Sequence, residues 1–257
     1  MNITNSERIQ TGQLDARPMQ IDEIRTPVIQ ERTDTMTAEA EKHLSSLRFW
    51  DKLTAEEKAY TLDSTFIRDY PKGSHIHSSE TECIGMTMLL DGEIRLSVIS
   101  EEGREITLYR LSEGDICMLT ASCVISQITF DTHMTAQTDC RLLIIAPHTF
   151  KRLTDSNIYA RCFMFELMTE RFSTVMWTMQ QILFLGYDRR LASFLLDEYD
   201  RTQSATIRMT HEQIALFTSS AREVVARMLK RFADEGLVEY RRGVLKLTDI
   251  EGLRLMK

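Results

Sequence analysis

The sequence predicts an α+β fold with two folded domains joined by a long helix. Three observations predict it. Five of the ten glycines lie between Gly73 and Asp115, where apolar residues alternate with polar ones as in short strands. Residues 158–186 then repeat apolar side chains at helical spacing. Residues 210–232 contain two helix starts separated by a short polar break, which is the pattern of a helix-turn-helix.

Length and composition are those of a globular protein. The chain has 257 residues, of which 43% are hydrophobic and 27% charged, enough for two domains and a sizeable core. No apolar run approaches the ~18 residues of a transmembrane helix, and the polar N-terminus lacks the apolar region of a signal peptide. We therefore expect a cytoplasmic protein with no membrane partner.

Charge is unevenly distributed along the chain. The net charge is −7, which is unusual for a protein that binds nucleic acid. Residues 189–257, however, carry 13 basic and 10 acidic side chains, so the positive excess lies in the segment with the helix-turn-helix. Because this excess is small, attraction to phosphates should be moderate and sensitive to salt.

The first 45 residues are polar and lack sustained apolar periodicity until Leu44, so they are expected to form a mobile N-terminal arm. The folded part should begin near residue 46. Thr54 followed three residues later by Glu57 is a capping box, which predicts a helix start. A strand is expected over residues 65–70, followed by a turn at 71–73.

The glycine-rich region predicts a β sandwich or barrel, because its short strands recur about every ten residues. Two strands should each point one apolar face inward: Ile94, Leu96 and Val98, then Ile106, Leu108 and Leu111. Residues 90–93 and 102–104 have the composition of hairpin turns. Residues 135–145 would supply the last strands.

Residues 158–186 predict a helix with a coiled-coil seam. Apolar side chains alternate there at spacings of three and four, over about two and a half heptads. The predicted dimer interface comprises Phe165, Met168, Phe172, Val175, Met179 and Ile182. A helix buried within one chain is the alternative. Methionine and phenylalanine pack adaptably, which would suit a helix whose pairing changes between states.

The helix-turn-helix is expected to begin at the capping box of Thr210 and Gln213, with a second capping box at Ser220 and Glu223. At 100° per residue, the second helix has one apolar face and one face with Arg222, Glu223, Arg227 and Lys230. Arginine can pair with guanine, and glutamate can accept from cytosine. The alternative is a solvated amphipathic helix, with Glu223 serving only as a cap.

A β-hairpin wing should follow the second helix, formed by residues 237–240 and 244–247 around two arginines that are placed to reach phosphates. Thr248 or Asp249 could cap the last helix. The predicted DNA contacts are Arg222, Glu223, Arg227, Lys230, Ser219, Ser220, Thr210, Arg241 and Arg242.

The segment from Ser220 to Lys230 resembles the recognition helix of Crp/Fnr-type transcription regulators, and residues 235–240 resemble that family's turn into the wing. The resemblance covers residues 46–257. After the N-terminal arm (1–45), it implies a cyclic-nucleotide-binding-like β jelly-roll (double-stranded β-helix) sensor domain (46–157), a dimerisation helix (158–186) and a winged helix-turn-helix domain (187–257).

The resemblance also implies a homodimeric regulator on a two-fold symmetric duplex, with RNA polymerase as a further partner if the protein is an activator. Arg222 suggests a TGTGA-like half-site rather than TTGAT, by analogy with family members. A sensor or scaffold protein whose helix-turn-helix contacts only protein is the competing class. An enzyme is disfavoured, because the sequence shows no nucleophile–base constellation, phosphate loop or metal-spaced cluster.

The resemblance identifies a candidate effector pocket but argues against cyclic nucleotides. In cyclic-AMP-binding relatives a Gly-Glu pair is followed by an arginine that neutralises the phosphate. Here Asp115 follows Gly114, and residues 111–140 contain no lysine or arginine. A buried phosphate without a cation would pay an uncompensated desolvation cost. The candidate pocket is instead apolar and rich in sulfur: Ile116, Cys117, Met118, Leu119 and Cys123.

Three effector classes remain open. Thiol redox sensing could use Cys117 with Cys123, or Cys83 with Cys140, although buried inert thiols are the simpler interpretation. Haem could be held by His75, His77 or a pocket Met or Cys, although two surface histidines beside a turn are simpler. A small apolar molecule is the third. The five cysteines form no C-x-x-C pair and no N-terminal cluster, which argues against iron–sulfur.

Overall fold

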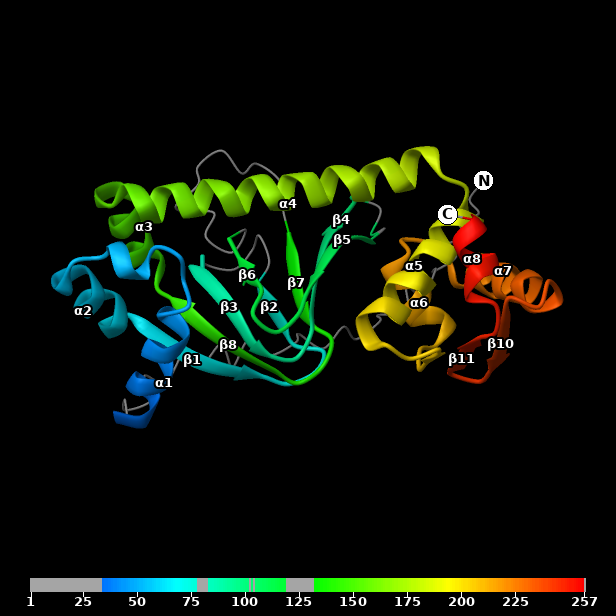
Figure 1. Ribbon diagram of the computed structural model, residues 1–257, viewed down its shortest axis with the longest axis horizontal. Coiled ribbons are helices and arrows are strands. Elements are labelled where there is room, and N and C mark those ends of the chain that lie inside the picture. Colours follow the sequence, from blue (N-terminus) through cyan, green and yellow to red (C-terminus); the bar gives the residue numbers. More distant parts are fainter. Residues whose placement is uncertain (1–33, 78–82, 102, 104, 119–131, 257) are drawn as a thin grey trace, which may run out of the picture. The chain divides into compact units, whose positions relative to one another are not determined.

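The computed structural model describes residues 34–77, 83–101, 103, 105–118 and 132–256 (Figure 1). Residues 1–33 of the expected arm, and Leu119 and Cys123 of the expected effector pocket, lie outside these ranges. From Asp34 onward the chain forms one compact unit.

The helices are α1 (Asp34–Leu44), the 3-10 helix η1 (Trp50–Lys52), α2 (Ala55–Asp63), α3 (Pro147–Ser156), α4 (Ile158–Phe184), α5 (Tyr187–Thr202), α6 (His211–Phe217), α7 (Arg222–Asp234) and α8 (Ile250–Met256). The strands are β1 (Thr65–Tyr70), β2 (His75–His77), β3 (Met86–Asp91), β4 (Ile94–Ile99), β5 (Glu105–Leu111), β6 (Ile116–Cys117), β7 (His133–Ala136), β8 (Cys140–Ile145), β9 (Thr206–Ile207), β10 (Val238–Arg241) and β11 (Val244–Leu247).

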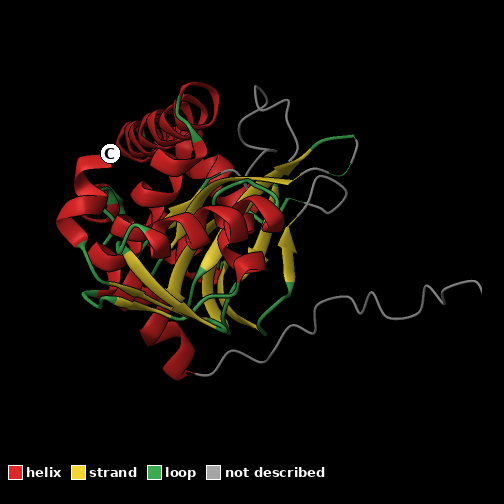
Figure 2. Cartoon of the chain, turned by 90° about the vertical axis from the view of Figure 1, so that its right-hand side faces the viewer, coloured by secondary structure: helices red, strands yellow, loops and turns green. Residues whose placement is uncertain are grey.

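Strands β1 to β8 form two antiparallel sheets, ordered β1-β8-β3-β6 and β2-β7-β4-β5 (Figure 2). Alternation along β8 shows how they are packed. Leu142 and Ile144 join a core that contains residues of both sheets. Leu143 and Ile145 point the other way, into a second core with α1, α3 and α4. This confirms the predicted jelly-roll, and we call residues 34–157 the β domain.

The two predicted hairpin turns have different outcomes. β4 and β5 pair as expected across the turn that contains Gly103. The turn at 90–93 is not a hairpin, because β3 and β4 belong to different sheets and the chain crosses between them there. Turn residues specify a change of direction, but they do not specify which strands pair afterwards.

Part of the expected arm is folded. α1 covers residues 34–44, and its Ala40 and Leu44 are buried in the core that α3 and α4 share. Arg141 of β8 donates two hydrogen bonds to the Glu39 carboxylate, at 2.7 and 2.9 Å. This helix has only a short apolar face, so its order depends on contacts far away in the sequence.

The C-terminal domain comprises α5–α8 with the small sheet β10-β11-β9. Its core is separate from the two cores of the β domain and includes Leu191, Ile214, Val225 and Phe232. Leu185 and Gly186 connect α4 to α5. The chain therefore contains the β domain, a long helix and a helical domain with a wing, as the sequence predicts.

The crossing turn gives a test of backbone strain. Gly92 has φ +98°, and a Cβ there would lie 2.4 Å from the Asp139 carbonyl oxygen. Gly114 has φ +86°, and a Cβ at that position would meet nothing within 4 Å. Gly114→Ala should therefore cost only the strain of ~1–3 kcal/mol, whereas Gly92→Ala should cost clearly more. Urea unfolding of both variants measures the difference, and equal losses would contradict the clash.

Candidate functional site

α6 and α7 form the predicted helix-turn-helix. Thr210 caps α6 through a full capping box, in which its hydroxyl accepts from the Gln213 amide and the Gln213 side chain accepts from the Thr210 amide. The capping box at Thr54 and Glu57 is present too, and the hydrogen bond from the Thr54 amide lowers the pKa of Glu57. Both caps are local signals, so the sequence predicts them directly.

The α7 start differs from the prediction. Ala221 is its N-cap and forms no side-chain cap bond. Ser220, the residue expected to cap α7, lies one position earlier, and its amide donates to the Ala215 carbonyl at 2.9 Å. Ser219 adopts φ +51° and is only 6% exposed. Its hydroxyl accepts from the Thr107 amide of β5 at 3.2 Å.

α7 separates a buried face from a charged one. Val225, Leu229 and Phe232 are buried in the C-terminal core, while Val224 and Met228 are half-buried. The opposite face exposes all four predicted base contacts: Arg222, Glu223, Arg227 and Lys230. None of the four forms an ion pair with any described residue. The charged face is therefore available to an external partner.

The wing lies next to the start of α6. Tyr240 of β10 stacks on His211, with ring centroids 4.3 Å apart. Burial lowers the pKa of His211, and the charge of Arg222 lowers it further. Arg241 and Arg242 are exposed at the tip of the hairpin, as expected. Asp249 rather than Thr248 caps α8, because its carboxylate accepts from the Gly252 amide at 2.8 Å.

α4 divides the predicted seam in two. Met168 and Val175 pack against the core of the β domain, and Ile182 is half-buried. Phe165, Phe172 and Met179 are exposed, and Phe172 is 66% exposed. Five of the exposed apolar residues of α4 form one stripe that is offset from the predicted seam: Phe165, Phe172, Met176, Met179 and Leu183. In the exposed stripe, Met176 and Leu183 thus take the place of the predicted interface residues that are buried or half-buried.

The candidate effector pocket is described in part. Cys117 and Met118 are buried, and Ile116 is half-buried on β6. A cavity of about 250 Å³ between β6 and α4 is lined by Ile116, Asp115, Phe163 and Arg171, among others. The hydroxyl of Tyr109 lies near Cys117, and burial raises its pKa.

Arg171 of α4 is a residue that sequence reasoning missed. Its guanidinium donates to Asp115 at 2.9 Å and to the Ile116 carbonyl at 3.4 Å, and it stacks over the Tyr109 ring at 5.1 Å. The sequence has no cation within residues 111–140, but the fold supplies one from a distant helix. Its position on the helix face towards the β domain was the signal that could have found it.

The comparisons with known proteins agree with this architecture. A family model described as a cyclic nucleotide-binding domain matches residues 67–157, and one described as a Crp-like helix-turn-helix domain matches residues 189–256. A solved structure from Eubacterium rectale, named for the crp/fnr family of transcriptional regulators, is 37% identical. It covers 81% of this chain and 97% of its own, with a TM-score of 0.78. The chain belongs to the Crp/Fnr family of transcription regulators.

Other Crp/Fnr proteins are more distant. The "cAMP-activated global transcriptional regulator CRP" of Pasteurella multocida is 24% identical over 69% of this chain and 87% of its own. Vfr of Pseudomonas aeruginosa, named in the same words, is 23% identical over 76% and 92%. These Crp/Fnr relatives regulate transcription and are not enzymes, so the chain is a DNA-binding transcription regulator of the same type.

The structure also places the cysteines and histidines that were considered for thiol sensing and haem binding in this Crp/Fnr chain. Cys117 and Cys140 are buried and form no disulfide, whereas Cys83 is disulfide-bonded, so neither of the two cysteine pairs considered forms a disulfide here. On β2, His75 is exposed and His77 is buried, so only one of the two histidines lies at the surface. Among the described residues, no cluster of three His, Cys, Asp or Glu is placed to hold a metal, and no described helix could cross a membrane.

Proposed function

We propose that this regulator is a cytoplasmic homodimer that binds a two-fold symmetric duplex, with α7 of each copy in the major groove. One observation carries the proposal. The exposed face of α7 presents Arg222, Glu223, Arg227 and Lys230, none of which forms an ion pair with another described residue, while its other face is fixed in the core. A recognition helix needs both properties. Ser220, Thr210 and the wing arginines 241 and 242 would contact phosphates.

The apolar stripe on α4 supports the dimer. Water-exposed Phe172, Leu183 and their neighbours at spacings of three and four would be buried by a second α4 packed in parallel. Large contiguous apolar patches are rare on monomers. Two copies would place the two α7 helices about 34–36 Å apart, the spacing of successive major grooves. If the protein activates transcription, RNA polymerase is the expected further partner.

The effector is proposed to be something other than a cyclic nucleotide. The relatives CRP and Vfr are named as cAMP-activated. In this chain two described arginines line the cavity, and each already faces a carboxylate: Arg171 pairs with Asp115 at 2.9 Å, and Arg48 pairs with Glu166 at 3.5 Å. A cyclic phosphate would have to displace one of these carboxylates. Thiol chemistry, haem and a small apolar molecule remain the candidate effectors.

Arg222 should read guanine. Arg222→Ala is expected to lose ~1–3 kcal/mol of discrimination at one position of the half-site, because a bidentate contact to O6 and N7 is lost. Sequence selection from a random duplex pool measures it. Arg231→Gln is the matched control, since Arg231 lies on the same helix but its guanidinium pairs with Glu235 at 2.8 Å. An unchanged base preference in Arg222→Ala would refute its role, and binding without salt dependence would favour the protein-scaffold alternative.

The stripe on α4 should hold the dimer. Phe172→Glu combined with Met179→Glu is expected to give monomers, because two copies would bury four uncompensated carboxylates. Sedimentation of the full-length protein measures the mass. Gln180→Glu adds one charge at an exposed neighbouring position and should remain dimeric. A monomeric wild type, or a dimeric double variant, would contradict this interface.

Cyclic AMP should not stabilise the wild type. A ligand at 1,000 times its Kd stabilises the folded state by ~4 kcal/mol, so millimolar cyclic AMP would raise the unfolding midpoint if it bound with micromolar affinity. We expect no shift. Asp115→Asn frees Arg171, so inorganic phosphate or cyclic AMP should bind that variant more tightly than the wild type. A midpoint raised in the wild type would overturn the proposal on the effector.

A further inference from the structure

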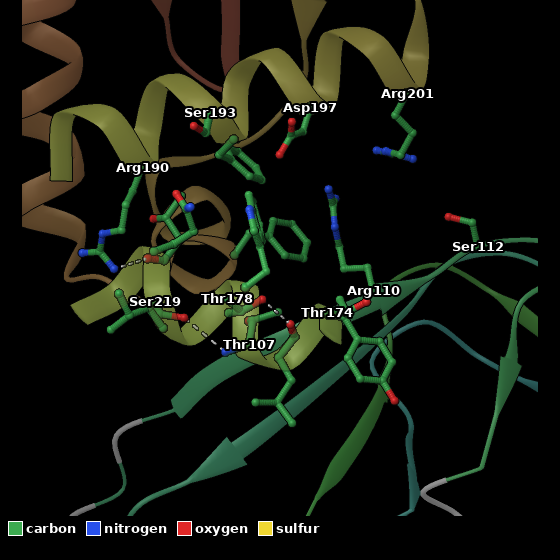
Figure 3. A pocket seen from close by; sticks show the side chains of 18 of the residues that line it. Thr107, Arg110, Ser112, Thr174, Thr178, Arg190, Ser193, Asp197, Arg201 and Ser219 are labelled. Atoms are coloured by element: carbon green, nitrogen blue, oxygen red, sulfur yellow. Dashed lines mark hydrogen bonds between the residues drawn. The ribbon is translucent and has the colours of Figure 1, made fainter. Parts of the chain in front are cut away.

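The outer edge of β5 is occupied by elements from the rest of the chain. β5 is the last strand of its sheet, and a bulge at Leu108 interrupts its pairing with β4 between Leu96 and Ser97. The Thr107 hydroxyl donates to the Leu216 carbonyl at 2.8 Å, in addition to the bond between its amide and Ser219. The Leu108 carbonyl accepts from Thr178 of α4 at 2.9 Å. Thr107, Leu108, Thr178 and Ser219 line one cavity of about 370 Å³, and Figure 3 shows the bond between Thr107 and Ser219 at its side.

Arg110, two residues after Leu108 on β5, belongs to a closed ring of four charged side chains. Glu93 and Arg110 belong to the β domain, and Glu198 and Arg201 belong to α5. Arg110 pairs with Glu93 at 3.3 Å and with Glu198; Arg201 pairs with Glu93 at 3.1 Å and with Glu198 at 2.7 Å. Each charge thus has two opposite partners, and the pairs Arg110–Glu198 and Arg201–Glu93 join the β domain to α5. Figure 3 shows Arg110 extending from β5 towards α5.

Because the ring is largely buried, it favours one orientation of the C-terminal domain on the β domain. The Glu198 side chain is 1% exposed, and the Arg110 guanidinium lies 4.7 Å from the centre of the Phe217 ring. Buried ion pairs add little net stability, but a packing that leaves one partner unpaired is strongly disfavoured. A rotation of the C-terminal domain would break the pairs of Arg110 and Glu93 with α5 together. The ring therefore selects a single docked orientation.

Docking leaves the DNA-reading face of α7 uncovered. The ring and the Thr107 contacts use α5 and the turn after α6, whereas Arg222, Arg227 and Lys230 remain exposed. A contact that masks the recognition helix would bury these side chains. The contact at β5 constrains where the recognition helix points without competing for its base contacts.

We infer that the four-charge ring of Glu93, Arg110, Glu198 and Arg201 is an orienting latch, which holds the DNA-binding domain on the β domain so that two recognition helices are preset for adjacent half-sites. This inference rests on the proposed dimer and its DNA site for its effect on binding. The docked orientation itself rests only on the contacts within one chain.

Arg110→Gln tests the latch. It removes one charge and leaves Glu198 with a single partner, so the C-terminal domain should lose its fixed orientation. Affinity for a duplex with two half-sites is expected to fall ~10-fold, since preorganisation of the two helices is lost. Affinity for a single half-site should stay unchanged. Amide exchange at Thr107 should accelerate, while exchange in the paired strands β1 and β8 should stay slow and so report an intact fold.

A double-mutant cycle with Glu198→Gln separates the ring from simple packing. Arg110→Gln with Glu198→Gln removes both charges and leaves the Glu93–Arg201 pair, so the double variant should recover most of the lost two-site affinity. Lys151→Gln is the control, because it breaks an exposed pair with Asp155 inside α3. That variant should behave as the wild type in every assay.

Three results would overturn the latch. If Arg110→Gln changed neither amide exchange at Thr107 nor the affinity for the duplex with two half-sites, the ring would not fix the orientation of the DNA-binding domain. Higher affinity for both duplexes would show that the contact masks the DNA-binding domain. Additive losses in the double variant would show that the charges act independently. A wild type that binds neither duplex refutes the proposed DNA site instead, and the exchange measurement at Thr107 still tests the docked orientation.

Discussion

The arrangement of the chain depends on how one strand edge, that of β5, is satisfied. An edge strand presents unpaired peptide groups that need partners. In β5 the partners are the turn after α6 for Thr107 and the long helix α4 for Leu108. Arg110 of the same strand reaches α5. Within four residues, β5 therefore bonds the β domain to both α4 and the DNA-binding domain. A displacement of β5 would break or shift its contacts with α4 and with the DNA-binding domain.

α4 complements this edge because it is apolar on two sides. Met164 and Leu167 are buried against the β domain, and Arg171 ties the same face to Asp115 at the cavity. The other side carries the exposed stripe with Phe172 and Leu183. The helix then leads through Leu185 and Gly186 into α5. One helix thus lines the candidate effector cavity, carries the proposed dimer interface and leads into the DNA-binding domain, so it would couple them if the cavity binds an effector.

The sequence predicts those features that local patterns determine. Capping boxes at Thr54 and Thr210, the polar face of α7 and the wing follow from spacing alone. The features that it does not predict depend on tertiary contacts. Ser220 has a capping pattern, but the N-cap of α7 is Ala221. The turn at 90–93 joins two sheets. The seam on α4 is shifted, because one face of the helix packs on the β domain. The charged ring pairs Arg110 with Glu198, which are 88 positions apart in the sequence.

The most direct measurement is a hydroxyl-radical and methylation footprint of the full-length protein on a duplex selected from random sequence. Two recognition helices in a fixed dimer predict two protected major-groove segments on one side of the duplex, ~34 Å apart, with guanine N7 protected in each. Protection of a single segment, or of two segments whose spacing varies freely between selected sites, would contradict a dimer that presents two α7 helices in one fixed orientation.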